Sequence, residues 1–343
     1  MSENEYEKMI DDLVVPEFLS DTEKGEKYKP LINYLDSNTP EKLFRFRSCS
    51  ERAFAEFDKD VFGFSPAFKM NDDFDGMLYF DKEHIKSTLL NLDVRKYIDL
   101  IQSGDIPETI KRHIPNEILN QLINNILANP TKDIVLIWKQ LTDFVIEDYD
   151  DNASIIGKAT QNQKIACLSQ KVESAAMWGY YANNGTGFAL AYDLREKNNH
   201  NHFIFPMIYG KKRIDGTEYA EWLLQQQTLQ SLLKVFCDGR FNSLAVRRFI
   251  PCPDLFMSTK VLIHKANCWK HEEEWRGIYY EKENENIEFP FIIQKPTAVY
   301  LGRNISEINE KIICQIASEK QLPIYKMEVR DDSISYYLFP KRL

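Results

Sequence analysis

The spacing of apolar residues changes twice along this chain, and these changes limit the folds that it can adopt. Before about residue 80 and after about residue 157, short segments such as LFRFRS, IACLS and FALAYD alternate or run apolar in the manner of strands. Between Asp81 and Ile156, apolar residues recur at helical spacing, as in DIVLIWKQLTDFVIEDY. A period of two is typical of strands and a period near 3.6 of amphipathic helices. The sequence therefore predicts an α+β fold with a mixed or split β-sheet core and helical insertions.

The same changes define the expected domains. Residues 1–40 are acidic and weakly periodic, and we expect an N-terminal arm that packs on the main body. Residues 41–80 and 157–343 are expected to form the α+β core domain, with a second helical segment at 217–250. Residues 81–156 are expected to form a helical insertion of three or four helices.

Local patterns predict the other elements of the core. Short helices are expected at SERAFAEFDKD and AAMWGYYA, and a longer one at residues 306–319. The NDDFDG segment predicts a polar turn. Further strands are expected at VFGFS, HFIFPMIYG, WRGIYYE, IEFPFII, AVYLG, PIYKMEVR and SISYYLF.

Charge and cysteine usage narrow the class of protein. A formal net charge of −9 argues against a protein that coats nucleic acid, although a local basic patch stays open. The six cysteines are scattered and form no CxxC pair, so we expect reduced thiols and a cytoplasmic location. No apolar run approaches the length of a membrane span, so we expect no membrane association.

Two arginines share one face of the first expected strand. In LFRFRS, Arg45 and Arg47 alternate with phenylalanines, and Ser48 follows. An unpaired buried guanidinium is costly, so these side chains must meet solvent, carboxylates or an anionic ligand. A pair of guanidiniums can bind a pyrophosphate or a ribose, and Ser48 could add a hydroxyl. The alternative is a solvated face with ordinary ion pairs.

The segment IACLSQKVESAAMWGYYANNGTGFALAYD concentrates aromatic rings beside glycines and asparagines. Aromatic side chains next to irregular backbone suit a pocket for a flat ring, which makes Trp178 and Tyr181 candidates for ring binding. Ser169, at the end of the preceding strand, could add a hydroxyl. The alternative is a hairpin with an aromatic hinge.

An acidic run enters a late strand in WKHEEEWRGIYY. Glu274 comes directly before the apolar strand residues, where a carboxylate could orient a hydroxyl or act as a base. The alternative is a solvated helix end formed by Glu272, Glu273 and Glu274. On the first interpretation, Glu274→Gln should abolish activity with little change in melting temperature.

Metal sites and common nucleotide motifs have weak support. Asp72, Asp73 and Asp75 could hold a divalent cation, but their spacing differs from a calcium loop and favours a capped turn. His264, Cys268 and His271 lack a fourth zinc ligand. We therefore expect no metal. Phosphate-loop and dinucleotide-fold glycine patterns are absent, as is the nucleophile elbow of the hydrolases.

Ordered landmarks along most of the chain resemble the bacterial domain-of-unknown-function 2971 family. That family carries no established activity. The landmarks are LFRFRS, FGFSPAFKMNDDFDG, CLSQ, MWGYYANNGTGFALAYD, FPMIYG, KANCWKHEEEWRGIYY and AVYLG.

The order of arginine, serine or tyrosine, and glutamate along the chain also resembles the ADP-ribosyltransferase superfamily. There, these groups lie on successive strands around NAD. The resemblance implies Glu274, Arg47 and Tyr181 as catalytic residues and NAD as a substrate. It further implies an ADP-ribosyltransferase-like sheet, with the glutamate stabilising the cationic sugar as nicotinamide leaves. The residues implied to bind NAD are Arg45, Arg47, Ser48, Asn71, Ser169, Trp178 and Tyr181.

The leading functional hypothesis is therefore an NAD-dependent ADP-ribosyltransferase that acts on an unidentified protein or nucleic-acid target. Such a protein could be a toxin or an antiphage defence effector with an antitoxin or defence partner. Two alternatives stay open: a non-catalytic nucleotide- or ligand-sensing adaptor, and a metal-dependent nuclease that uses the three aspartates. The first two hypotheses require Arg47, Tyr181 and Glu274 to line one cleft.

Overall fold

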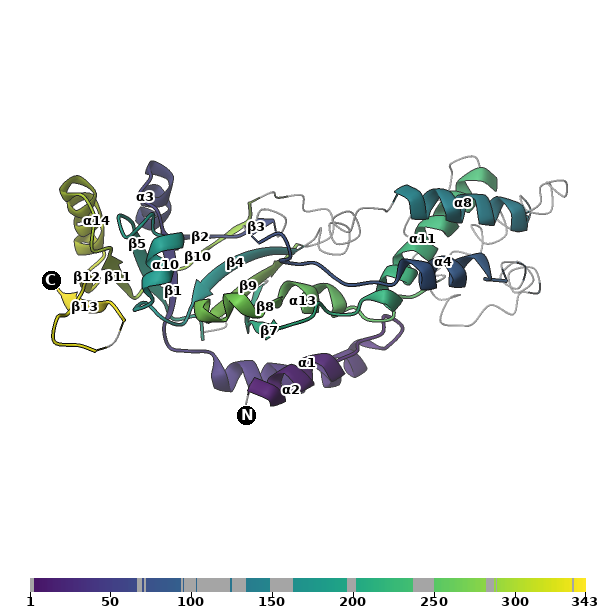
Figure 1. The fold of residues 1–343 in the computed structure, drawn as a ribbon, viewed down its shortest axis with the longest axis horizontal. Helices are drawn as coiled ribbons and strands as arrows, with labels where there is room; N and C mark the ends of the chain where they lie inside the picture. The colour runs from purple at the N-terminus through teal and green to yellow at the C-terminus, as the bar shows by residue number, and fades with distance from the viewer. Residues whose placement is uncertain are drawn as a thin grey trace. The chain divides into compact units, whose positions relative to one another are not determined.

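The computed structural model forms two compact units (Figure 1). Unit 1 comprises Met1–Pro30, Met77–Ala159 and Arg213–Val261, and unit 2 comprises Leu31–Gly76, Thr160–Lys212 and Leu262–Leu343. The structure describes residues 3–66, 70, 72–93, 95, 103, 124, 134–148, 163–195, 202–236, 250–281, 287, 289–334 and 336–343.

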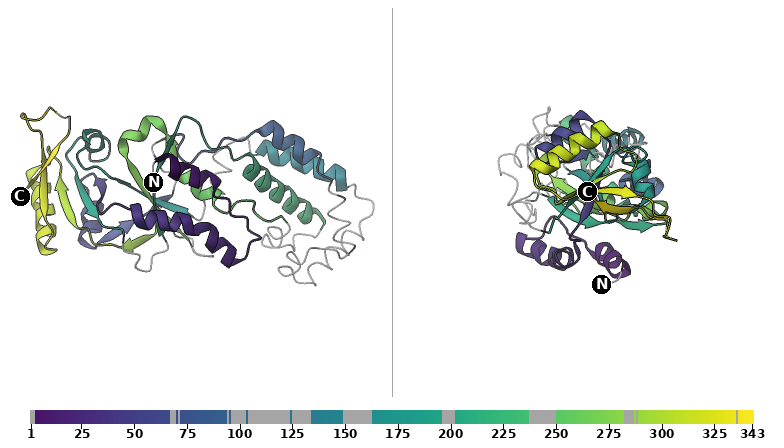
Figure 2. Two further views of the ribbon diagram at one scale, coloured as in Figure 1. Left: turned by 90° about the horizontal axis from the view of Figure 1, so that it is seen from below. Right: turned by 90° about the vertical axis from the view of Figure 1, so that its left-hand side faces the viewer.

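Unit 1 is helical in its described part. Three of its helices, α4, α8 and α11, pack side by side, as both Figure 1 and Figure 2 show. Their contact is apolar, and the Trp138 indole adds a hydrogen bond of 2.8 Å to the Leu89 carbonyl. The cluster consists of Phe80, Ile85, Leu89, Val145, Ala220 and Leu224. The helices are α1 (Glu3–Asp12), the start of α2 (Asp21–Asn38), α4 (Lys82–Leu90), α8 (Ile134–Asp148), α11 (Thr217–Phe236) and α13 (Met257–Leu262).

The division into units differs from the expected domains at residues 213–261. The sequence predicts that this range belongs to the core domain, but α11 belongs to unit 1 because its apolar side faces α4 and α8. Most of the expected insertion at 81–156 lies outside the described residues, and α4 and α8 are its described helices. Among the described residues, no helix is long and apolar enough to cross a membrane.

The N-terminal segment is bound to unit 1 by backbone pairing rather than by side chains alone. Leu255 N donates to Val15 O at 2.8 Å, and Val15 N donates to Asp254 Oδ1 at 3.0 Å. Lys260 Nζ lies 3.2 Å from Asp254 and balances its buried charge. The first part of the expected arm therefore packs as a component of the helical unit.

Unit 2 is built on a nine-stranded mixed sheet, which confirms the α+β class. The order is β13-β12-β11-β5-β1-β4-β9-β6, with β3 paired to β4 beside this path. The β11–β12 pair is parallel and the other pairs are antiparallel. The strands are β1 (Leu43–Arg47), β3 (Ser65–Pro66), β4 (Gln163–Ser169), β5 (Phe188–Tyr192), β6 (His202–Pro206), β9 (Glu274–Tyr280), β11 (Ala298–Leu301), β12 (Ile324–Glu328) and β13 (Phe339–Arg342).

The described residues of unit 2 also include two small sheets, the end of α2 and four further helices. β2 (Val61–Gly63) pairs with β10 (Phe291–Ile293), and β7 (Ile208–Gly210) pairs with β8 (His264–Ala266). On β10, Phe291 and Ile293 are exposed at 59% and 62%, while Ile292 is buried against β2. The helices are α3 (Glu51–Asp58), α10 (Ala175–Tyr180), η2 (Asn267–Glu272) and α14 (Glu307–Glu319).

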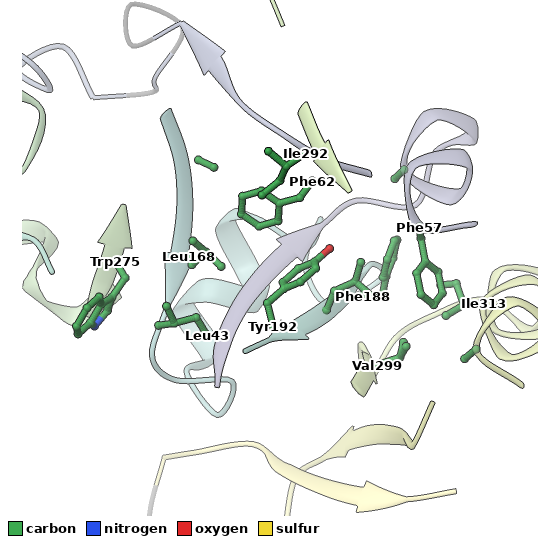
Figure 3. Packing of buried hydrophobic residues seen from close by; sticks show 14 of the residues in the cluster. Leu43, Phe57, Phe62, Leu168, Phe188, Tyr192, Trp275, Ile292, Val299 and Ile313 are labelled. Carbon is green, nitrogen blue, oxygen red and sulfur yellow. The ribbon is translucent and has the colours of Figure 1, made fainter. Parts of the chain in front are cut away.

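The sheet is covered on both faces near β1. Leu43 belongs to a cluster that includes residues of α3 and α14, whereas Phe44 and Phe46 pack with α10 in a second cluster. This division follows from strand alternation, which sends successive side chains to opposite faces. Figure 3 shows the first cluster, in which the Phe62 and Tyr192 rings meet edge to face with centroids 5.0 Å apart.

The break after α10 has the local chemistry that its sequence predicts. Asn183, Asn184 and Gly185 have φ of 48°, 56° and 75° in succession. Asparagine and glycine tolerate this left-handed region better than other residues. Gly187 has a separate reason, because a Cβ there would lie 2.1 Å from the carbonyl oxygen of Arg47.

The last predicted strand begins later than expected. The SISYYLF segment mostly connects β12 to β13, and the strand starts at Phe339, which pairs with Glu328. The preceding residue, Leu338, donates its amide to Glu173 O instead of to the sheet. In the connection, Ile334 and Tyr336 are 100% and 99% exposed. The alternation in this segment therefore reflects an exposed loop.

Candidate functional site

The nine-stranded sheet of unit 2 is split between β1 and β4. β1 pairs with β5 along all five of its residues, and β4 pairs with β9 along all seven. β1 and β4 themselves share one pair, Phe44 with Ser169. Beyond this junction the two strands separate, and β3 joins β4 at Ile165. A wedge therefore opens between β1 and β4 within a continuous sheet.

A cavity of about 420 Å³ lies in this split. Its volume falls in the range of about 300–1,000 Å³ that is usual for small-molecule sites. β1, β4, α10 and the segment around η2 supply most of the lining. The cavity brings together Arg45, Arg47, Asp75, Cys167, Ser169, Tyr180, Tyr181, Lys265, Glu272 and Glu274.

The wall formed by β1 is cationic. Arg45 donates to Gly63 O at 2.8 Å, and its guanidinium lies 4.7 Å from the centre of the Phe62 ring. Burial and the neighbouring charge of Arg47 lower the pKa of Arg45 to about 10, so it stays protonated at neutral pH. Arg47 forms an ion pair with Glu56. Within the described part of the chain, Arg45 forms no ion pair with a carboxylate, and its hydrogen bond goes to the Gly63 carbonyl.

The opposite wall is a network of buried ion pairs centred on Lys265. The Lys265 ammonium lies 2.5 Å from Glu272 and 3.0 Å from Glu274. Arg276 lies 2.8 Å from Glu274 and binds Asp75 through two nitrogens at 2.7 and 2.8 Å. Three carboxylates thus face two cations, which leaves one net negative charge.

Burial makes this network electrostatically strong. Glu272, Glu274 and Arg276 are 2%, 4% and 0% exposed. Burial alone would raise the pKa of Glu274, but Arg276 and Lys265 hold it below the usual 4.5. Burial likewise opposes the charge of Lys265, and its two glutamates nevertheless raise the Lys265 pKa above 10.5. Both groups are therefore charged at neutral pH.

A backbone kink at Glu273 places its two neighbours in the cavity. Glu273 ends η2 with φ 42° and ψ 52°, in the left-handed region. Glu272 and Glu274 consequently both reach Lys265, while the Glu273 side chain turns away to pair with Lys171. Of the three glutamates, the two on either side of the kink are therefore buried, and the alternative of a solvated helix end is wrong for them.

Tyr181 connects α10 to this network. Its hydroxyl donates to Glu272 Oε1 at 2.6 Å. Arg47, Tyr181 and Glu274 therefore line one cavity, as the single-cleft hypothesis requires. Glu274 Oε2 faces Lys265 and its Oε1 accepts from Arg276, so both oxygens are held by cations. The structure therefore predicts, against the expectation of an unchanged melting temperature, that Glu274→Gln lowers it, because the amide would remove a buried counter-charge.

Of the other residues predicted to bind NAD, some line the cavity and some do not. Ser169 lines the cavity, but its hydroxyl is engaged by the backbone at Glu272 O (2.7 Å) and Lys171 N (3.1 Å). Trp178 is a buried core residue, and its indole donates to Val172 O at 2.6 Å. Ser48 is exposed and outside the lining. Asn71 lies outside the described residues.

The aspartate loop is a capped turn with one buried ion pair. Asp72 Oδ1 accepts from Phe74 N at 3.0 Å, and Asp75 N donates to Asp72 O at 3.0 Å. Asp75 turns toward Arg276. His271 Nδ1 lies 3.0 Å from Cys268 O. No group of three or more potential metal ligands occurs in the part of the chain that the structure covers.

Sequence reasoning missed the cations of the network. Lys265, Arg276 and the role of Asp75 were not among the predicted site residues. Arg276 had a detectable signal, because it follows Glu274 by two residues and therefore shares its side of the strand. Lys265 and Asp75 reach the site through tertiary packing, which residue spacing does not encode.

Residues 177–277 match a family model described as Protein of unknown function (DUF2971). This match confirms the expected resemblance. Curated proteins and solved structures give no match. The DUF2971 region contains Tyr181, the Lys265–Glu272–Glu274 network and Arg276, whereas Arg45 and Asp75 lie outside it. The matched region therefore carries most of the ionic wall, and the arginine wall comes from an earlier part of the chain.

Proposed function

We propose that the cavity binds NAD and that the protein is an ADP-ribosyltransferase with an ADP-ribosyltransferase-like split sheet. The observation that carries this proposal is the opposite charge of the two walls. Arg45 is a cation without a carboxylate partner among the described residues, and the facing network has one net negative charge. NAD has matching ends, because its nicotinamide ring is cationic and its pyrophosphate is anionic.

In the proposed orientation, Arg45 and Arg47 bind the pyrophosphate, and the nicotinamide riboside lies toward Glu272 and Glu274. The bond between C1′ of the ribose and the nicotinamide nitrogen breaks, and its electron pair leaves with neutral nicotinamide. The sugar then carries positive charge at C1′. A wall with excess negative charge in a buried site stabilises this charge. An acceptor nucleophile bonds to C1′ and releases its proton to solvent.

The two glutamates have different parts in this proposal. Glu272 receives the Tyr181 hydroxyl at 2.6 Å and shares Lys265 with Glu274. Glu274 is held by two cations, Lys265 and Arg276. We assign ribose orientation to the Tyr181–Glu272 pair and charge stabilisation to Glu274. Trp178 has no ring-binding part here because it lies in the core.

The experiment that tests the proposal combines the purified protein, NAD labelled in the adenosine half, and a cell extract. Release of nicotinamide together with transfer of label to a macromolecule supports the proposal. The proposal would be contradicted if the protein neither released nicotinamide nor bound NAD. The further expectation of a toxin or defence effector, with its partner, stays a prediction that growth arrest on expression would support.

One observation favours a second candidate, a non-catalytic nucleotide sensor. Lys265 and Arg276 each bind one oxygen of Glu274. A carboxylate held in this way can serve to stabilise the fold rather than to take part in a reaction. NAD binding by calorimetry without any nicotinamide release would select the sensor. A rate of release that falls with loss of Tyr181 or Glu272 would select the enzyme.

A further inference from the structure

His271 is an exposed histidine at the edge of the cavity. It directly precedes Glu272, which is 2% exposed and lines the cavity. The centre of its ring lies 6.2 Å from that of Tyr180, which also lines the cavity and is 63% exposed. The Trp269 ring packs beside it, with the two centroids 6.1 Å apart. His271 is therefore held where the cavity meets solvent, on the side of the ionic wall.

The tautomer of the His271 ring follows from its hydrogen bond. Nδ1 lies 3.0 Å from the carbonyl oxygen of Cys268. A carbonyl oxygen can only accept, so Nδ1 must carry a hydrogen and donate it. In the neutral imidazole, the other nitrogen, Nε2, then has a free lone pair. Nothing in the described part of the chain binds Nε2, so a basic nitrogen is available at the edge of the cavity.

The carboxylates of the cavity are poorly suited to accept a proton. Glu272 Oε1 accepts from the Tyr181 hydroxyl, and its Oε2 accepts from Lys265. The oxygens of Glu274 accept from Arg276 and Lys265, and those of Asp75 accept from Arg276.

A carboxylate whose charge is balanced by nearby cations binds a proton weakly. The reaction proposed above nevertheless releases a proton from the acceptor. Since each of these six oxygens already accepts a hydrogen bond, that proton needs a different base.

We propose that His271 Nε2 is the general base of the transfer step, which deepens and rests on the proposed function. An O–H or N–H group of the acceptor bonds to C1′ of the ribose. The bond from C1′ to nicotinamide breaks, and its electron pair leaves with nicotinamide. The proton of the acceptor goes to Nε2, and the exposed imidazolium then gives it to solvent. The Cys268 carbonyl keeps Nδ1 protonated throughout, so the ring has a single site for the incoming proton.

The experiment compares wild type and His271→Ala in the transfer of label from NAD to macromolecules of a cell extract. General-base catalysis typically contributes about a hundred- to ten-thousandfold, so the transfer rate should fall by a factor in that range. Added imidazole should restore part of the rate in proportion to its concentration, because it replaces a missing base but not a missing packing contact.

Two controls accompany this comparison. NAD affinity, measured by calorimetry, should stay unchanged in His271→Ala, since His271 is not among the residues that line the cavity. His84→Ala removes an exposed histidine of unit 1 and should leave the transfer rate unchanged.

A second measurement needs no turnover. The NMR shifts of the two ring nitrogens distinguish the tautomers of neutral His271, and a hydrogen on Nδ1 is expected. A hydrogen on Nε2 would overturn the proposal. A wild-type transfer rate in His271→Ala, or a loss that imidazole does not restore, would also overturn it and leave the proposed function in place. A wild type that neither releases nicotinamide nor transfers label would instead contradict the proposed function, and the assignment of His271 with it.

Discussion

The Ser169 hydroxyl donates a hydrogen bond of 2.7 Å to the main-chain carbonyl of Glu272. Ser169 is also the residue that pairs with Phe44 where β1 and β4 meet. One buried side chain thus connects the junction of the split to the segment that carries both cavity glutamates. This hydrogen bond adds to the β4–β9 pairing that holds the ionic wall beside β4.

Replacing Ser169 with alanine should weaken this connection. The change leaves Glu272 O and Lys171 N without their partner, and an unsatisfied buried polar group costs about 1–3 kcal/mol. Urea unfolding measures the loss. Ser48→Ala, at an exposed serine next to the same strand, should stay within about 0.5 kcal/mol of the wild type. Equal stability of the two variants would show that the connection contributes nothing.

Replacing Glu274 with glutamine should lower stability strongly. Lys265 and Arg276 then lose a buried counter-charge, and removal of one partner from a buried ion pair costs about 3–5 kcal/mol. Glu273→Gln breaks only the partly exposed pair with Lys171 and should cost under about 1 kcal/mol. Melting temperatures of both variants check the contrast. An unchanged melting temperature in Glu274→Gln would argue against the ionic network.

Replacing Arg45 with glutamine should weaken NAD binding without unfolding the protein. A hydrogen bond to a charged group contributes about 1.5–3 kcal/mol, so the dissociation constant should rise about ten- to a hundredfold. Arg52 is the matched control, since it is a nearby arginine that pairs with Glu56 and is absent from the cavity lining. Calorimetric titration with NAD measures both. If Arg45→Gln and Arg52→Gln lost similar affinity for NAD, the protein would attract NAD through its overall positive charges and not through Arg45 in the cavity.

Acid should destabilise unit 2 through Glu274. The Glu274 pKa is lowered in the folded state, so its contribution to stability is present above pH 4.5 and is lost as the pH falls through the folded value. Lys265 has the opposite sign: its contribution is fully present below pH 10.5 and is lost as the pH rises through its raised pKa. Unfolding free energies of wild type and Glu274→Gln from pH 7 to pH 3 should therefore converge. A difference in unfolding free energy between wild type and Glu274→Gln that stays constant over this pH range would show that the charge of Glu274 does not stabilise the fold.

The strands of the site were predictable because each has a strong local pattern. LFRFRS became β1 with its arginines on one face, IACLS falls within β4, and WRGIYYE matches β9 to within one residue at each end. The Asn-Gly break and the Asp72 turn also follow from local backbone chemistry. These features depend on residues within a few positions of one another, which a single sequence records.

The ionic wall was less accessible to sequence reasoning. Three consecutive glutamates look alike in a sequence, but the left-handed backbone at Glu273 buries its two neighbours and leaves the middle one half-buried. Asp75 meets Arg276 across 201 positions, and no periodicity reports a contact at that separation. The position of α11 in unit 1 was missed for the same reason, since its partners α4 and α8 are distant in the sequence.

The exposed strand β10 has a consequence for how the protein behaves at high concentration. Phe291 and Ile293 give this short strand an apolar outer face, and among the described strands it pairs only with β2. An exposed apolar edge is a template for adding strands from other molecules. Self-association should therefore increase with concentration, and Ile293→Lys should suppress it without reaching the cavity in the split. Light scattering across a dilution series would separate aggregation of this kind from any ligand-dependent change.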